Sequence, residues 1–352
     1  MTGFPSGFAG REMPEIGIKR MRKRRILIVG GVFVIFDGHS DLLYDVTRAR
    51  LRGACRVLER CHLDHLHSGQ IEGLVLALWP GVGDEPFWPA GMDAGSHAAR
   101  LEQMLCCMEA ELGECPWLTV VRTAAEAEAA KDAGNVYAFL GVEGLAAIGD
   151  DLDRIDALAG RGVRLATLTW NEENLLATGA KGDPQKGLTP LGRQAVRRLQ
   201  ERSVLVDVSH LNDGGFWDVL RLAEGTVIAS HSNCRALCDV RRNLTDEQLR
   251  AIRDTGGVVG LNVHHAFVHA ERERQTAEVL ARHAAHMAEV MGVEHVACGF
   301  DFCEYFGPGN EGAEGLENCS QTHNLFFWLE KLGFSAGERE MIARKNFLRA
   351  LA

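Results

Sequence analysis

Six residues that commonly bind metal ions or move protons follow short β-branched runs of this sequence. They are His39, Asp41, Glu143, His210, His231 and Asp301. His39 and Asp41 are two residues apart, and an extended backbone directs side chains with that spacing to the same side. Imidazole and carboxylate groups suit zinc or a similar divalent ion, and six of them exceed what one catalytic zinc needs. The set therefore predicts two metal ions bridged by a carboxylate.

The runs that precede these residues have the pattern of repeated βα units. The strand candidates are Val32–Phe36, Leu74–Trp79, Val136–Gly141, Arg164–Thr169, Val204–Val208, Val227–Ser230, Val258–Asn262 and Val296–Phe300. The helix candidates between them are Ser96–Leu112, Ala124–Ala133, Pro190–Arg202, Gly215–Ala223, Thr245–Thr255 and Arg274–Met291. This alternation predicts an α/β fold, a (β/α)8 TIM barrel. Barrel chemistry is found at the carboxyl ends of the strands, so the six residues are expected at one mouth.

The weight of this prediction rests on the whole set, because a single histidine at a strand end is more often structural than a ligand. Other histidines are assigned structural or surface roles. They are His62, His65 and His67 before the second strand, and His265, His283 and His286 near or after the seventh. His264 is also expected to be structural, although it is close enough to the end of the seventh strand to touch a substrate.

Composition indicates one large globular domain. The chain has 352 residues, of which 46% are hydrophobic and 24% charged, and one barrel commonly reaches this length. We expect residues 25–352 to form the barrel and residues 1–24 to be an N-terminal extension that is poorly ordered. The net charge of -10 would repel a phosphate backbone, so nucleic acid is not an expected partner.

A basic run from Lys19 to Arg25 and the apolar stretch Ile26 to Phe36 together imitate the start of a secretory signal peptide. No small-residue cleavage site follows, and the stretch is too short to span a bilayer as a helix. The ten cysteines show no CxxC pair, so buried reduced thiols are favoured over a disulfide framework. These features predict a cytoplasmic protein without a membrane partner.

Four motifs closely resemble the signatures of the renal (membrane) dipeptidase family of zinc-dependent dipeptidases, in the same order and at similar spacing. They are Asp37-Gly38-His39-Ser40-Asp41, Gly141-Val142-Glu143-Gly144, Val206-Asp207-Val208-Ser209-His210 and Ser230-His231-Ser232. Three further segments are similar: Gly187 to Gly192, Arg241 to Asp246 and Asn346 to Arg349. The resemblance covers residues 35 to 350 and is highly specific in combination.

The resemblance implies hydrolysis of the peptide bond of a dipeptide at a centre of two zinc ions. His39 and Asp41 would bind one ion, His210 and His231 the other, and Glu143 would bridge them together with a water or hydroxide. Asp301 would handle protons near that water, so Glu143 and Asp301 are the expected catalytic carboxylates.

Arg242, eleven residues after His231, would pair with the free carboxylate of the substrate. A planar guanidinium suits this role because it holds a carboxylate through two parallel hydrogen bonds. Without the resemblance, Arg242 would be interpreted as a surface or helix-capping arginine beside Asp239 and Asp246.

The sequence departs from the family pattern at two positions. Trp170 stands where the mammalian enzymes have a histidine that helps to bind the substrate carbonyl. Carbonyl stabilisation is then expected from the second zinc, from Asn171 or from Asn174, and Trp170 and Asn171 are interpreted as substrate-binding residues. Cys303 stands where an aspartate is common. Neither change touches an expected zinc ligand, so substrate preference is the property that these positions leave open.

Two other functions remain as alternatives. One is a zinc hydrolase that acts on another amide or a lactone, and the other is a non-catalytic barrel that only binds metal. The latter is disfavoured because the ligand set and Asp301 are complete. The resemblance leaves open a substrate with a D-residue at its carboxyl end, and a homodimer is a common state for such enzymes.

Overall fold

The computed structural model describes residues 34–81 and 95–352. The expected N-terminal extension, the basic run and the first two residues of the first expected strand lie outside the described residues. The division into an extension and one barrel domain therefore stays a prediction.

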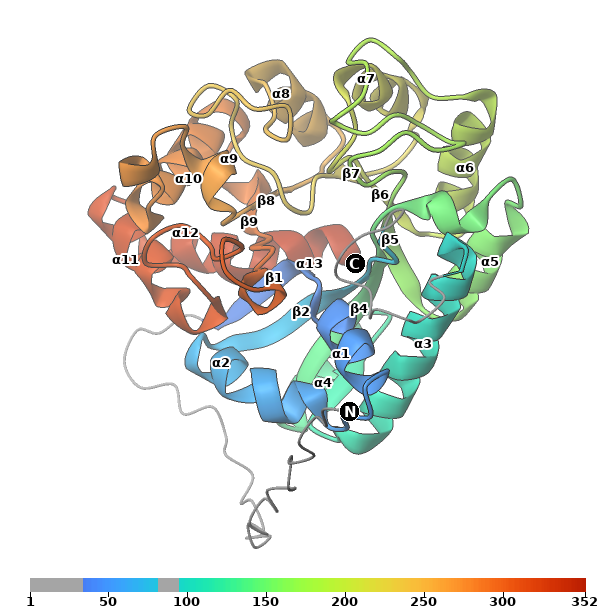
Figure 1. Ribbon diagram of the computed structural model, residues 1–352. Coiled ribbons are helices and arrows are strands. Elements are labelled where there is room, and N and C mark those ends of the chain that lie inside the picture. Colours follow the sequence, from blue (N-terminus) through green and yellow to red (C-terminus); the bar gives the residue numbers. More distant parts are fainter. Residues whose placement is uncertain (1–33, 82–94) are drawn as a thin grey trace, which may run out of the picture.

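Eight parallel strands curl into a barrel (Figure 1). They are β1 (Ile35–Ser40), β2 (Ile71–Leu78), β4 (Val136–Val142), β5 (Val163–Thr167), β6 (Leu205–Asp207), β7 (Val227–Ile228), β8 (Val259–Leu261) and β9 (Val296–Cys298). Strands β1-β2-β4-β5-β6-β7 pair in that order, and β8 pairs with β9. The Ala229 amide donates to Val258 O at 3.0 Å and joins β7 to β8, while the Asp301 amide donates to His39 O at 3.3 Å and joins β9 to β1. The α/β barrel predicted from the sequence is confirmed.

Two details of the strands differ from the prediction. The short strand β3 (Leu118–Val120) pairs with the first half of β4, outside the ring of eight, and three residues are too few to give an alternating pattern. Strand β1 begins at Ile35 and runs through Gly38 and His39 to Ser40, beyond the predicted end at Phe36. Residues such as Asp37 and Gly38 have a low intrinsic β preference, but they are part of the strand because β1 pairs with β2.

Helices form a ring around the barrel (Figure 1). The longer ones are α1 (Leu42–Arg50), α3 (His97–Glu114), α4 (Ala124–Asp132), α5 (Asp153–Gly160), α6 (Pro190–Glu201), α7 (Asp213–Leu222), α8 (Asp246–Asp254), α10 (Ala277–Met291) and α11 (His323–Lys331); the shorter ones are α2 (Leu63–Ser68), α9 (His265–Val268), α12 (Ala336–Glu340) and α13 (Asn346–Leu351). The six predicted helices are confirmed to within three residues at each end. Ser96, Thr189 and Thr245 cap α3, α6 and α8 by accepting an amide hydrogen bond within the first turn.

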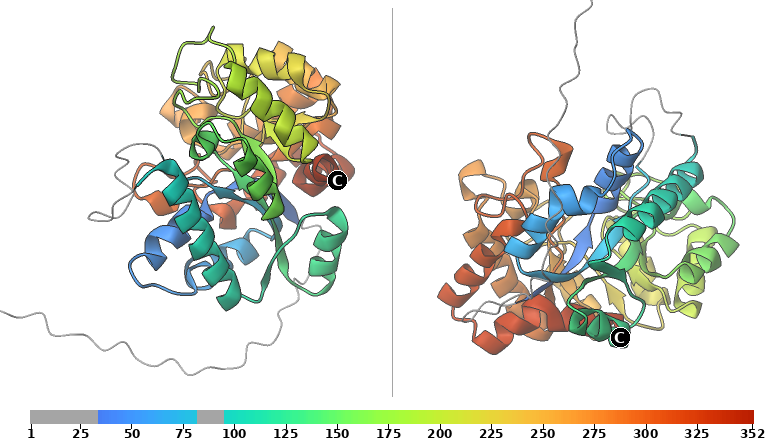
Figure 2. Two further views of the ribbon diagram at one scale, coloured as in Figure 1. Left: turned by 90° about the vertical axis from the view of Figure 1, so that its right-hand side faces the viewer. Right: turned by 90° about the horizontal axis from the view of Figure 1, so that it is seen from below.

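The apolar core has two layers. The larger lies between the strands and the surrounding helices, and the smaller fills the barrel with residues such as Phe36, Val75 and Phe139. Helix α13 closes the amino-terminal end of the barrel (Figure 2), where the Phe347 ring centre lies 5.4 Å from that of Phe36. A Cβ atom at Gly38 would lie 2.1 Å from Phe347 Cε2, so only glycine allows this approach.

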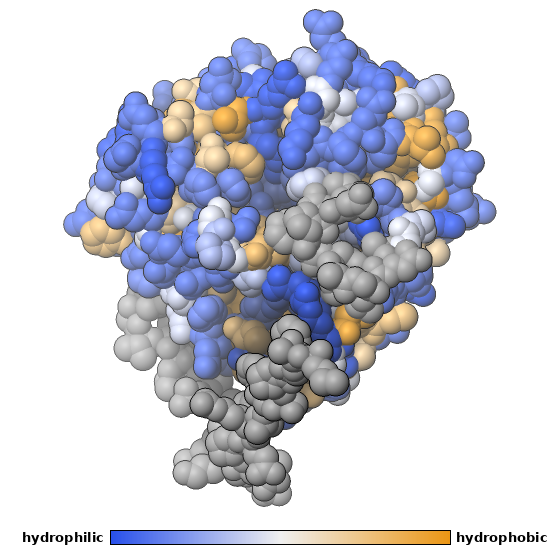
Figure 3. Space-filling view, viewed as in Figure 1, coloured by the Kyte–Doolittle hydropathy of each residue, from blue (hydrophilic) through white to orange (hydrophobic). Residues whose placement is uncertain are grey.

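The face seen in Figure 3 is largely hydrophilic, with only small hydrophobic patches. Within residues 34–81 and 95–352, none of the helices combines the length and apolar character needed to cross a bilayer. All ten cysteines lie in this described part and none forms a disulfide, but Cys55, Cys61 and Cys106 are exposed. The expectation of buried thiols is therefore wrong for these three, because they lie on the outer faces of the peripheral segments.

Candidate metal centre

The six residues singled out in the sequence meet at the carboxyl-terminal mouth of the barrel, with Glu143 in the middle. Glu143 Oε1 lies 3.8 Å from His39 Nε2, 2.7 Å from His210 Nε2 and 3.4 Å from His231 Nε2. His39 Nε2 also lies 3.6 Å from Asp41 Oδ1 and 3.9 Å from Asp301 Oδ1. Two overlapping groups are compact enough to hold a metal ion: His39, Glu143 and His231, and His39, Asp41 and Asp301.

The alternation of strand β4 explains the position of Glu143. Tyr137 and Phe139 point into the barrel and belong to its inner core. With a period of two residues, position 141 also faces inward, and a Cβ there would lie 3.0 Å from Val75 Cγ1. Glu143 is the next inward position, so the inner row of apolar side chains ends in a carboxylate at the mouth.

Two site residues have an uncommon backbone conformation. His210 has φ 70° and Asp301 has φ 59°, in the left-handed region that residues with a Cβ atom seldom adopt. Both follow the end of a strand, and the left-handed turn redirects each side chain over the mouth. Such strain persists only where the surrounding structure holds it, and it is concentrated at functional sites.

Two buried carboxylates hold these turns in place. Asp37 Oδ1 accepts from the amides of Phe300 at 2.8 Å and His39 at 3.3 Å, which links β1 to the segment after β9. Asp207 Oδ1 accepts from the amides of Ser209 at 2.9 Å and Ser230 at 3.0 Å, which links β6 to β7. Burial raises the pKa of Asp37 to about 7 against the lowering effect of its backbone hydrogen bonds. Sequence reasoning gave these aspartates no role, although a carboxylate inside an apolar run is the signal that marks them.

The histidine rings are oriented by partners on their second nitrogen. His210 Nδ1 lies 3.0 Å from Asn171 Oδ1, and His231 Nδ1 lies 2.7 Å from Ser230 Oγ. These contacts leave each Nε2 directed toward Glu143, and such outer partners fix the orientation of metal-binding imidazoles. Asn171, which the sequence suggested for substrate binding, thus has an orienting contact with His210.

The electrostatics of the site favour a bound cation. Burial alone would lower the pKa of His39, but the charges of Glu143 and Asp41 raise it to about 10. Burial and the charge of Asp41 raise the pKa of Glu143 well above its usual value, while burial lowers the pKa of His210 and that of His231. Anionic groups are therefore crowded together beside neutral imidazoles, an arrangement that a divalent cation would relieve.

Unpaired polar atoms support the same conclusion. His39 Nε2 and Asp41 Oδ1 are buried and have no hydrogen-bond partner. A buried polar atom without a partner is costly, so each of these atoms requires an interaction that the protein itself does not supply. The donor set of imidazole nitrogens and carboxylate oxygens fits zinc.

Comparison with known families agrees with this geometry. The family model of the membrane dipeptidases, peptidase family M19, matches residues 23–352. The chain belongs to the membrane dipeptidase family. It is therefore a metallopeptidase of the dipeptidase class, a hydrolase.

Several relatives extend this assignment. An uncharacterized protein from the pqqA 5' region of Klebsiella pneumoniae is 35% identical over 60% of this chain and 79% of its own length. An uncharacterized dipeptidase of Schizosaccharomyces pombe is 32% identical over 61% of this chain, and the match spans 52% of the yeast protein.

Solved structures of two similar metallopeptidases have the same fold, and one of them is described as a member of family M19. The metallopeptidase dipeptidase AC superposes with a TM-score of 0.78 at 27% identity, over 91% of this chain and 98% of its own. A metallopeptidase from Rhodobacter sphaeroides superposes with a TM-score of 0.77 at 28% identity, over 91% and 99%. The latter was solved with a phosphinate mimic of the dipeptide L-Ala-D-Ala.

Arg242 lies beside the imidazole ligands. Its Nη2 is 3.0 Å from His210 Nε2 and donates to His231 O at 3.3 Å, and its guanidinium lies over the Phe267 ring. Arg242 is buried, and its Nε has no hydrogen-bond partner. A buried guanidinium with an unused donor at the mouth is available to a carboxylate of the substrate. The alternative of a surface or capping arginine does not fit this burial.

Asp301 and Cys303 lie together on the other side of the centre. Asn262 Nδ2 donates to Asp301 Oδ2 at 2.9 Å, and Cys303 Sγ lies 3.5 Å from Asp301 Oδ1. Burial raises the pKa of Asp301 to about 6. Sequence reasoning did not single out Asn262, which ends the predicted seventh strand and which only the fold brings to Asp301.

Several other residues from the sequence analysis have different surroundings. Trp170 packs against Trp79, with ring centres 5.1 Å apart. Asn174 is used within its own loop, where its side chain donates to Leu168 O and accepts from the Leu176 amide. His264 stacks on Phe267, and its Nδ1 is buried without a partner. Asn174 is thus not placed for carbonyl binding, whereas His264 has an unused polar atom near Arg242.

His62 is a buried structural histidine, although it lies closer to the mouth than expected. Its Nε2 is 2.9 Å from Asp45 Oδ2, in the first turn of α1. Its ring packs edge-on against Tyr305, which follows β9. The segment before β2 therefore supports the wall of the mouth.

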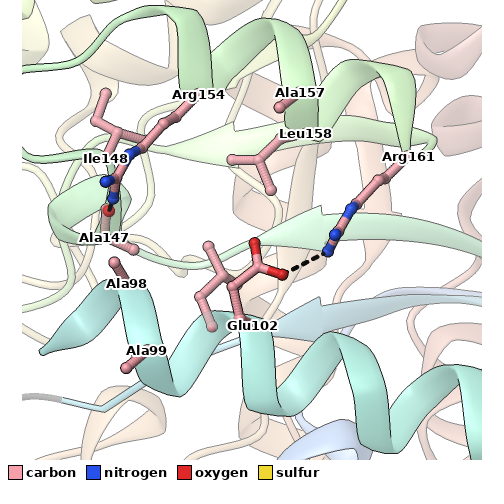
Figure 4. Close-up of a pocket in the computed structure, with 10 residues that line it drawn as sticks. Ala98, Ala99, Glu102, Ala147, Ile148, Arg154, Ala157, Leu158 and Arg161 are labelled. Carbon is pink, nitrogen blue, oxygen red and sulfur yellow. Dashed lines mark hydrogen bonds and ion pairs between the residues drawn. The ribbon is translucent and has the colours of Figure 1, made fainter. Parts of the chain in front are cut away.

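Two surface cavities lie apart from the metal centre. One of about 400 Å³ lies between α3 and α5 (Figure 4), where Glu102 Oε2 pairs with Arg161 Nη1 at 3.0 Å and Arg154 donates to Ala147 O at 2.9 Å. The other, about 680 Å³, lies between α9 and the loop after β9. Neither is lined by any of the six residues. The polar groups drawn in Figure 4 are already paired with one another or with the backbone, so this cavity lacks the unused groups of the barrel mouth.

Proposed function

We propose that this enzyme hydrolyses dipeptides at a centre of two zinc ions bridged by Glu143. The observation that carries the proposal is the convergence of six residues from five strand ends, with Glu143 at the centre and with buried His39 and Asp41 atoms that lack a partner. His39 and Asp41 would hold one ion, and His210 and His231 the other. Bound there, the zinc ions would supply hydroxide near neutral pH and polarise the peptide carbonyl.

Asp301 is suited to proton transfer. Its carboxylate is largely buried beside His39, with one oxygen held by Asn262. A pKa raised to about 6 lets it accept a proton from the attacking water and give it up to the departing amine near neutral pH. In this role Asn262 keeps the carboxylate in one orientation through the reaction.

Arg242 limits the length of the substrate. Its unused Nε lies in a buried site, where binding of a carboxylate is much stronger than at the surface. A dipeptide carries its free carboxylate one residue beyond the scissile bond, whereas the corresponding position of a protein chain is an uncharged peptide group. Arg242 therefore selects dipeptides over longer chains.

We extend the proposal to substrates with a D-residue at the carboxyl end. The relative from Rhodobacter sphaeroides binds a phosphinate mimic of L-Ala-D-Ala, and it aligns with 91% of this chain. The similar fold of the two proteins supports the proposal that this enzyme also accepts a D-residue at the carboxyl end of its substrate.

The test is a substrate panel with zinc-loaded protein. L-Ala-L-Ala and L-Ala-D-Ala are compared with L-Ala-L-Ala amide, in which the carboxylate is blocked, and with N-acetyl-L-alanine and a small lactone. We expect turnover of the dipeptides and a loss of at least about a hundredfold in kcat/KM for the amide. Faster turnover of the N-acyl amino acid or the lactone would contradict the dipeptide assignment and favour the alternative function, hydrolysis of another amide or of a lactone.

A further inference from the structure

The loop that contains Lys181 is attached to the metal centre through its backbone. The Ala180 amide donates to His210 O at 2.8 Å, and the Lys181 amide donates to Asn171 O at 3.1 Å. The Asn171 side chain in turn contacts His210 Nδ1. Residues 180 and 181 are thus fixed relative to one histidine of the site.

The side chain of Lys181 lies over Trp170. Lys181 Nζ is 5.2 Å from the centre of the Trp170 ring, and that ring centre is 6.1 Å from the ring centre of His210. An ammonium group therefore lies at the rim of the mouth, within electrostatic reach of the centre.

Within residues 34–81 and 95–352 this ammonium forms no ion pair, and its charge acts on Glu172, where it partly offsets the burial that raises the pKa of that carboxyl group. The contrast is with Lys186 in the same loop, which forms an ion pair with Glu173. Lys181 is exposed, and its ammonium group lies over the indole of Trp170. In a chain with a net charge of -10, an unpaired lysine at the mouth is a local exception to the overall field.

We propose that Lys181 selects dipeptides that carry a carboxylate in a side chain, that is, dipeptides of aspartate or glutamate. The proposal rests on the dipeptidase function given above and adds the substrate class. Arg242 would bind the main-chain carboxylate of the substrate, and Lys181 would bind its side-chain carboxylate beside the Trp170 ring. The two Cα atoms of a dipeptide are about 3.8 Å apart, so an acidic side chain from either residue extends toward the rim while the peptide bond stays at the centre.

The experiment compares glutamate with glutamine, its uncharged isostere, at each position. Ala-Glu, Ala-Gln, Glu-Ala and Gln-Ala are assayed with the wild type and with Lys181→Met, Lys181→Glu and Lys186→Met. For the wild type we expect kcat/KM to favour glutamate about tenfold at one of the two positions, mainly through KM. Lys181→Met should bring that ratio close to one, Lys181→Glu should invert it, and Lys186→Met should preserve it.

The outcomes separate the two proposals. If the glutamine dipeptides are hydrolysed and the Glu/Gln ratio is the same in the wild type and Lys181→Met, the inference about Lys181 is overturned while the dipeptidase function stands. An equal fall of kcat for all four substrates in Lys181→Met would also overturn it, because it would indicate a structural role. If the zinc-loaded wild type hydrolyses none of these or the alanine dipeptides, the proposed function itself fails. A glutamate preference that weakens in 0.5 M salt only in proteins that retain Lys181 would support the inference further.

Discussion

The two sides of the metal centre differ in charge and in hydrogen bonding. The acidic side, His39, Asp41 and Asp301, contains two carboxylates and two buried atoms without a partner. The imidazole side, His210 and His231 with Arg242, contains neutral rings, whose Nδ1 atoms contact Asn171 and Ser230. The difference indicates that the acidic side attracts a cation by charge, whereas the imidazole side is organised in advance by hydrogen bonds beside a fixed positive charge.

Glu143 is the residue that the two sides share, so its substitution should have the largest effect. Glu143→Gln removes the central negative charge, and we expect zinc content to fall from about two to less than one per chain and kcat/KM to fall at least about a thousandfold. Elemental analysis and dipeptide assays measure both. Glu314→Gln, at an exposed position, is the matched control and should resemble the wild type. Full zinc content in Glu143→Gln would contradict the shared-ligand assignment.

Asp301→Asn tests the catalytic part of the acidic side. The isosteric amide cannot accept the proton, so we expect kcat to fall by about a hundredfold to ten-thousandfold. Zinc content should stay near two per chain, in contrast to His231→Ala, which should lose metal. A fully active Asp301→Asn protein would refute the proton-transfer role.

Asn171→Ala and Asn262→Ala compare the orienting residues of the two sides. Asn171→Ala removes the partner of His210, and we expect zinc affinity to fall about tenfold to a hundredfold. Asn262→Ala removes the partner of Asp301, and here the expected result is a lower kcat with unchanged zinc affinity. Competition with a chromogenic chelator gives the affinities. Equal changes of zinc affinity and kcat in the two variants would show that Asn171 and Asn262 do not have separate roles in metal binding and in proton transfer.

Stepwise removal of zinc gives the smallest expected difference. Arg242 repels a cation on the imidazole side and carboxylates attract one on the acidic side, so zinc should leave in two phases with affinities about tenfold apart. Zinc per chain is measured against chelator concentration. In Arg242→Met the zinc affinity of the imidazole side should rise, so the affinities of the two phases should become more alike. Release of zinc in a single phase from the wild type would show that the difference in charge between the two sides does not change their zinc affinities.

Sequence reasoning succeeded where the signal is local. The six helix candidates, each recognised from a run of neighbouring positions, agree with the structure to within three residues at each end. The convergence of six side chains followed from the rule that barrel strands end at one mouth. The assignment of these residues as ligands stays a prediction until the metal is measured.

The features that could not be predicted are contacts between distant segments. Asn171 reaches His210 across 39 positions, and Asn262 reaches Asp301 across the same separation. Asp37 joins the amide of Phe300 across 263 positions. Nothing in the sequence around Lys181 distinguishes it from Lys186, because the difference is the loop geometry that pairs one lysine and leaves the other over Trp170.

The contact between Gly38 and Phe347 bears on how the protein is made. Phe347 must be synthesised before its ring can pack against strand β1 and close the amino-terminal end of the barrel. Until then, the apolar side chains of Phe36 and its neighbours stay exposed at this end of the barrel, and such transient exposure favours aggregation. Assembly of the metal-binding mouth is therefore expected only after residue 347 has been synthesised.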